Sequence, residues 1–142
     1  MRRVRVLGID LGSKRIGVAV SDATGMLASP LTVLQRSGDP AADHRALAGL
    51  VRQEEAQRVV VGLPLSLSGA VGPAARAALE EAAAMADVVG VPVETFDERL
   101  TTVQAGRSMI DQQLRAKTRK RIIDKVAAAV MLQAWLESRA AS

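Results

Sequence analysis

Short apolar runs rich in β-branched residues recur along the chain and predict five strands. These runs span Val4–Asp10, Arg15–Ser21, Met26–Gln35, Arg58–Leu63 and Val91–Phe96. The fourth, RVVVGL, is apolar almost throughout, which is typical of a strand buried on both faces of a parallel sheet. The second run alternates enough to pair with the first as a hairpin. Pro30 inside the third run favours an edge strand or a bend, because proline cannot donate to the ladder of a sheet.

Between and after these runs, apolar residues recur at helical spacing. Leu47, Leu50 and Val51 fall on one face of a helix predicted from Asp43 to about Gln57. Further helices are predicted from Pro73 to about Ala86, from Thr101 or Thr102 to about Ile110, and from about Thr118 to Ser138. This order of elements predicts an α/β fold: a mixed five-stranded sheet with helices on both faces, in a single domain over residues 1–142.

Composition restricts the classes of function that are open to the chain. The 142 residues are 49% hydrophobic and 24% charged, which suits a folded domain. The chain has no Cys, so disulfides and thiolate metal sites are excluded. It shows no apolar leader and no run of 18 apolar residues, so we expect a soluble, cytoplasmic protein without a membrane partner. The net charge of +4 and the pI near 10.3 favour an anionic partner.

Acidic residues at three places in the chain are candidates for chemistry. Asp10 ends the first predicted strand, and Asp97 and Glu98 follow the fifth. Asp124 lies in the last predicted helix, beside its apolar face. Carboxyl ends of adjacent parallel strands meet at one edge of a sheet, so these acids would repel one another unless divalent cations neutralised them. Two such ions can hydrolyse a phosphodiester. A turn role for Asp10, and surface ion pairing for Asp124, remain open at this stage.

Four motifs follow one another along the chain: GIDLGSKRIGVAVSD, VGLPLSLSGAVG, DERLTT and IDKVAAAVMLQAWL. In order and spacing they resemble the YqgF/RuvX family of small bacterial proteins, from Val4 to Leu136. The resemblance implies an RNase H-like fold related to the RuvC Holliday junction resolvase. It also implies a nuclease of ribosome biogenesis that matures the 5′ end of pre-16S rRNA, although some members are described as junction resolvases.

Carried over by motif, Asp10, Glu98 and Asp124 would be the catalytic acids, and they would hold Mg²⁺ or Mn²⁺. The DER motif favours Glu98 over Asp97, which the residues alone do not separate. Asp97 would then be a supporting group or a ligand in exchange with Glu98.

Polar and basic residues near these acids are candidates for binding nucleic-acid phosphate: Lys14, Arg15, Ser66, Arg99, Arg121 and Lys125. Lys14 and Arg15 are equally well explained as solvated charges of a turn. Aromatic residues are only 1% of the chain, and Trp135 belongs to the apolar side of the last helix. Because stacking on unpaired bases needs aromatic side chains, we expect recognition of a structured or duplex substrate through its backbone and shape.

Other functions stay open at this stage. The actin, Hsp70 and sugar-kinase superfamily also begins with a Gly-Ile-Asp-Leu-Gly motif, but those enzymes need two such domains. A non-catalytic RNA-binding factor of ribosome maturation would keep the fold without cleavage. A resolvase acting on branched DNA would need two sites and hence a homodimer. A Ser-His-acid site is not supported, since the only histidine, His44, is expected on the solvent side of a surface helix.

Overall fold

The computed structural model describes residues 5–66, 68–100 and 119–140. Its strands are β1 (Val6–Leu11), β2 (Arg15–Ser21), β3 (Ala28–Gln35), β4 (Arg58–Leu63) and β5 (Val93–Asp97). Its helices are α1 (Pro40–Gln53), α2 (Pro73–Val89), the 3₁₀ turn η1 (Glu98–Leu100) and α4 (Arg119–Ala140). The helix predicted from Thr101 or Thr102 to Ile110 lies outside the described residues.

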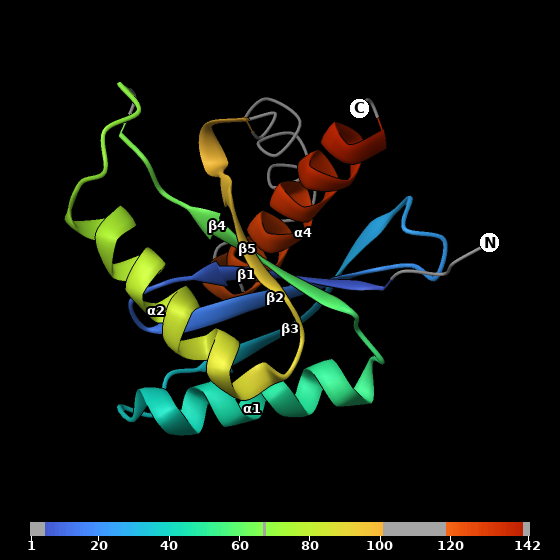
Figure 1. Cartoon of the computed structure of the whole chain (residues 1–142), viewed down its shortest axis with the longest axis horizontal. Helices are drawn as coiled ribbons and strands as arrows, with labels where there is room; N and C mark the ends of the chain where they lie inside the picture. Colours follow the sequence, from blue (N-terminus) through green and yellow to red (C-terminus); the bar gives the residue numbers. More distant parts are fainter. Residues whose placement is uncertain (1–4, 67, 101–118, 141–142) are drawn as a thin grey trace.

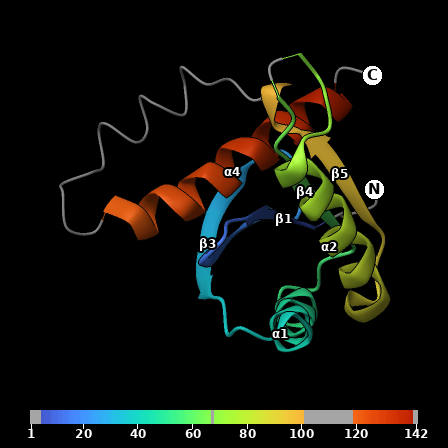
Figure 2. The same ribbon diagram turned by 90° about the vertical axis from the view of Figure 1, so that its left-hand side faces the viewer.

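The five strands form one mixed sheet in the order β3-β2-β1-β4-β5. β1 pairs with β2, and β2 with β3, in antiparallel fashion, whereas β1 with β4, and β4 with β5, pair in parallel. Helices α1 and α2 cover one face of the sheet and α4 crosses the other (Figures 1 and 2). The predicted mixed sheet with helices on both faces is therefore confirmed.

The edge strand β3 carries the predicted proline. Pro30 pairs opposite Ala19 on β2, next to a shift of register between Val18 and Ala19. A residue without a backbone N–H is tolerated there because one side of an edge strand has no partner strand.

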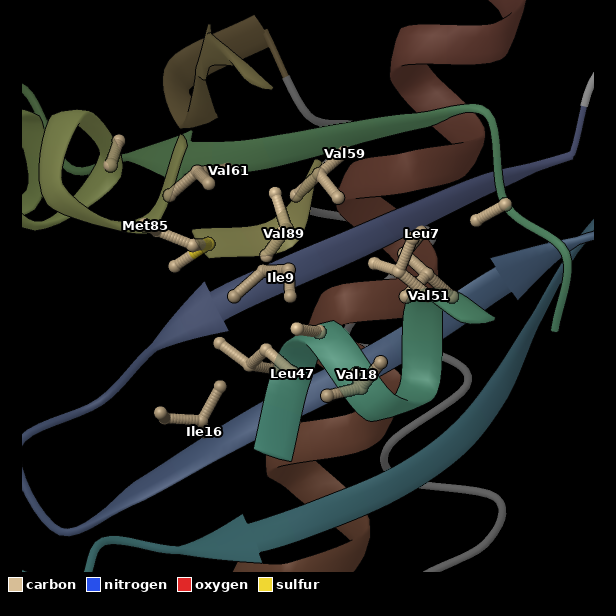
Figure 3. Packing of buried hydrophobic residues seen from close by; sticks show 13 residues of the cluster. Leu7, Ile9, Ile16, Val18, Leu47, Val51, Val59, Val61, Met85 and Val89 are labelled. Atoms are coloured by element: carbon tan, nitrogen blue, oxygen red, sulfur yellow. The ribbon is translucent and has the colours of Figure 1, made fainter. Parts of the chain in front are cut away.

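Two aliphatic clusters hold the layers together. On the first face, Leu7 and Ile9 of β1 pack with Leu47 of α1 and Met85 of α2, all fully buried (Figure 3). On the second face, Val6, Ala19 and Val60 of the strands pack with buried side chains of α4: Ala128, Ala129, Met131, Leu132, Trp135 and Leu136. A Cβ placed on Gly8 of β1 would lie 2.8 Å from Leu132 Cβ, so α4 packs directly against the strand backbone.

Helix α1 begins earlier than the hydrophobic pattern predicts. Asp39 caps it by accepting a hydrogen bond from Ala41 N at 3.1 Å, and Pro40 occupies the first turn. The expectation for His44 is wrong: its side chain is buried, at 4% relative exposure, and its Nε2 lies 2.9 Å from Glu81 Oε2 on α2. The contact between α1 and α2 covers this part of α1. The local sequence pattern does not reveal this contact, because it depends on residues of another helix.

Within the described ranges, no helix is both long enough and apolar enough to span a bilayer.

Candidate active site

The alternation of side chains along β1 places Asp10 on the α4 face of the sheet. Val6 belongs to the cluster under α4, and Leu7 and Ile9 belong to the opposite cluster. Since side chains alternate along a strand, Gly8 and Asp10 share the face of Val6. Asp10 pairs opposite Gly17 of β2, and on its other side it neighbours Gly62 of β4, because Ile9 is in register with Val61.

Glu98 reaches Asp10 from the end of β5. The strand ends at Asp97, and η1 begins at once with Glu98. Its side chain lies over Gly62, because a Cβ built there would be 2.5 Å from Glu98 Oε1. The carboxyl groups of Glu98 and Asp10 share a hydrogen bond. Two acids remote in sequence thus meet at the carboxyl ends of β1 and β5.

This meeting perturbs the protonation of Glu98. Burial raises its pKa most, and the negative charge of Asp10 and the hydrogen bond to it raise it further, from 4.5 to about 7. A carboxyl group in this position keeps its proton when no cation neutralises the negative charge beside it.

Asp97, the neighbouring acid, is hydrogen-bonded to Arg99. It accepts hydrogen bonds from Arg99 N at 2.9 Å, from Arg99 Nε at 3.0 Å and from Arg99 Nη2 at 2.6 Å. The hydrogen bonds from Arg99 lower the pKa of Asp97 below its usual range. The geometry therefore separates the two adjacent acids: Glu98 faces Asp10, and Asp97 orients Arg99.

The loop between β4 and α2 closes on itself beside this site. Ser66 N donates to Ala70 O at 3.2 Å, Ala70 N donates to Ser66 Oγ at 3.1 Å, and Gly69 N donates to Ser66 O at 2.8 Å. A Cβ on Gly69 would lie 3.3 Å from Arg99 Nη1, so the loop packs against the guanidinium. Ser66 shapes this loop through its own hydrogen bonds, and its side chain is exposed.

The turn between β1 and β2 follows Asp10 closely in the chain. Gly12 N donates to Arg15 O at 2.9 Å and closes the turn, with Lys14 exposed at its tip. Arg36 Nε donates to Gly12 O at 2.8 Å, while both terminal nitrogens of Arg36 bind the carboxylate of Glu81 at 2.8 and 2.9 Å.

Sequence reasoning missed the ion pair between Arg36 and Glu81, and the contact of Glu81 with His44. Arg36 and Glu81 are 45 residues apart, and neither stands in a motif. Arg36 directly follows β3 and Glu81 lies on α2, so only the tertiary packing brings them together.

Asp124, Arg121 and Lys125 lie in the first turns of α4, and their side chains are outside the part of the structure that is described. Among the described residues, no group of three His, Cys, Asp or Glu side chains forms a metal-binding cluster. Asp10 and Glu98 alone supply two convergent oxygen donors, which suit a hard divalent cation.

The strand order β3-β2-β1-β4-β5 and the two carboxyl groups that meet at the ends of β1 and β5 define a protein of the RNase H-like class. Solved structures support this fold. "T. thermophilus RuvC in complex with Holliday junction substrate" has a TM-score of 0.61 and 20% identity over 96% of both chains. "Thermus thermophilus RuvC structure" has a TM-score of 0.59 and 19% identity over 97% of both.

Within this class the chain belongs to the RuvX family: residues 4–138 match the family described as "RuvX: Holliday junction resolvase". A relative from Mycobacterium sp. (strain KMS), named "Putative pre-16S rRNA nuclease", is 48% identical over 141 residues, which cover 99% of this chain and 83% of the relative. A relative of the same name from Gloeobacter violaceus is 46% identical over 139 residues, 98% of this chain and 87% of the relative. The resemblance carried by the four motifs is confirmed.

Proposed function

We propose that this protein is a metal-dependent nuclease that hydrolyses phosphodiester bonds in structured nucleic acid, with the 5′ end of pre-16S rRNA as its substrate. The names of the relatives support the substrate. The observation that carries the proposal is the contact between Glu98 and Asp10. Two acids held together at the carboxyl ends of the strands are stable as anions only with a cation between them. Such a substrate implies a cytoplasmic location.

Asp10, Glu98 and Asp124 would hold Mg²⁺ or Mn²⁺. Asp124 comes four residues before Ala128 and eight before Leu132, and these two buried residues pack on the face of the sheet that carries Asp10. In a regular helix these positions form one stripe, which supports the choice of Asp124 as the third ligand. When bound, divalent ions activate water and stabilise the leaving oxygen of the phosphodiester.

The residues of the chain would hold the substrate phosphate against these acids. Arg99, oriented by Asp97 and by the loop that contains Ser66, stands next to Glu98 in the sequence and would bind phosphate through its guanidinium group. Lys14 and Arg15 at the β1–β2 turn, with Arg121 and Lys125 on α4, would extend this contact along the backbone of the nucleic acid.

Branched DNA is the second candidate substrate. The fold matches that of a resolvase solved with a Holliday junction, and the family carries the description of a resolvase. A cut on both strands of a junction requires two active sites, so this function would require a homodimer, whereas trimming of rRNA would not.

The test is a parallel cleavage assay with a pre-16S rRNA leader and a four-way DNA junction, each with Mg²⁺ and with Mn²⁺. Asp10→Asn should abolish cleavage and leave the fold and most of the nucleic-acid affinity intact, whereas Asp87→Asn, an exposed acid on α2, should cleave as the wild type does. Cleavage by Asp10→Asn at the wild-type rate would refute the site. If the wild type binds rRNA but cuts neither substrate, the protein is a non-catalytic RNA-binding maturation factor.

A further inference from the structure

Gly62 lies in β4, between β1, which carries Asp10, and β5, which Glu98 directly follows. β4 separates β1 from β5 in the sheet, so the backbones that carry Asp10 and Glu98 are two strand spacings, about 10 Å, apart. A contact between their carboxyl groups has to cross β4 on the α4 face. The Glu98 side chain crosses at Gly62.

The space above Gly62 admits no side chain while Glu98 is in this position. A Cβ at residue 62 would lie 2.5 Å from Glu98 Oε1 and 3.1 Å from both Glu98 Cγ and Cδ. Cβ atoms do not approach a carboxylate oxygen this closely, so a methyl group would displace the glutamate.

Backbone conformation gives no other reason for a glycine here. Gly62 is buried in a regular strand, and it is not one of the described glycines with a positive φ, which are Gly25, Gly38, Gly69 and Gly90. Other residues are favoured over glycine in strand interiors, because glycine gains nothing from packing and loses more backbone entropy on folding.

We propose that Gly62 is a positioning residue: the absence of a side chain at this point of β4 lets the Glu98 carboxyl cross the strand and meet Asp10. The catalytic consequence rests on the proposed nuclease function, whereas the geometric claim concerns the protein without substrate or metal.

The first measurement is cleavage by Gly62→Ala. Displacement of one catalytic carboxyl should lower kcat about 100-fold, with KM for the nucleic acid nearly unchanged, because the groups that bind the backbone are untouched. The rise in Tm that Mn²⁺ produces should shrink in the same variant, since one oxygen donor has moved away.

The second measurement is a double-mutant cycle on thermal stability without metal, and it does not depend on activity. With Glu98 present and at pH 5, where its displacement from Asp10 relieves little charge repulsion, Gly62→Ala should lower Tm or leave it unchanged. In the Glu98→Ala background the methyl group has room, so Gly62→Ala should raise Tm, as alanine generally does where the backbone accepts it. We expect an interaction of at least about 2 °C between the two sites.

Gly8→Ala is the matched control. It also adds a methyl group to the α4 face of a strand, but that group would press on Leu132 and not on Glu98. It should lower Tm equally in the presence and absence of Glu98 and leave the Mn²⁺-induced shift intact.

Additive Tm changes for Gly62→Ala and Glu98→Ala would overturn the inference, and so would wild-type kcat in Gly62→Ala. If the wild-type protein cleaves nothing, the proposed function fails, and the stability cycle still decides the role of Gly62.

Discussion

The raised pKa of Glu98 makes stability without metal a direct test of the site. In the unfolded chain Glu98 ionises near 4.5, whereas in the folded protein it keeps its proton up to about 7. The folded state therefore binds more protons between these values, and the free energy of unfolding should fall as the pH rises from about 4.5 to about 7. Glu98→Gln removes this titration and keeps the shape and a hydrogen-bond donor towards Asp10.

The size of the effect follows from the shift. At about 1.4 kcal/mol per pKa unit, the rise from 4.5 to about 7 corresponds to roughly 3 kcal/mol at most. Because solvent reaches part of the side chain, screening reduces this to about 1–2 kcal/mol. Above about pH 8 and without divalent ions, Glu98→Gln should thus be more stable than the wild type by about 1–2 kcal/mol, a rise in Tm of roughly 3–8 °C.

Urea and thermal denaturation in the presence of a chelator measure this difference. Most of it should disappear near pH 5, where the folded wild type is already protonated at Glu98. With saturating Mg²⁺ or Mn²⁺ the order should reverse, since the wild type gains more from the cation. Glu80→Gln, an exposed acid on α2, should change stability by less than about 0.5 kcal/mol at either pH. A variant less stable than the wild type above pH 8, or a gain that does not depend on pH, would refute the repulsion between the two acids.

Three further changes test the supports of the site. Glu81→Gln should cost roughly 1–3 kcal/mol in urea denaturation at neutral pH, because Arg36 and His44 lose a charged acceptor. Burial would raise the pKa of Glu81, but the hydrogen bonds from Arg36 and His44 outweigh burial and lower this pKa. The loss of stability in Glu81→Gln should therefore be present above pH 4.5 and shrink as the pH falls. A loss that grows in acid would contradict the pairing. Asp97→Asn should change Tm little yet lower kcat, since Arg99 loses its anchor beside Glu98, and equal kcat would show that Arg99 needs no orientation. Leu132→Ala should destabilise the fold by about 2–5 kcal/mol, because Leu132 is fully buried over β1, and a loss below 1 kcal/mol would mean that α4 does not depend on this contact.

Local patterns in the sequence were sufficient for most of the elements. β2 and β4 have the predicted bounds, because apolar runs of β-branched residues between turn residues favour strands whatever surrounds them. The sequence also contained the signal for the true start of α1, Asp39 followed by Pro40, but the hydrophobic pattern begins later and conceals it. The motifs identified the family and singled out Asp10 and Glu98 as candidates.

Tertiary structure decided what depends on contacts between distant residues. It turned Glu98 towards Asp10 and paired Asp97 with Arg99, although the two acids are adjacent and alike in the sequence. It buried His44 against Glu81, 37 residues away, where the local pattern predicted a solvent-facing side chain. It also explains the glycine at position 62, which no local rule does, since the side chain that needs the space belongs to Glu98 in η1, 36 residues further along the chain. Periodicity is a property of neighbours along the chain, whereas charge, burial and free space at a site are set by the strands and helices that pack around it.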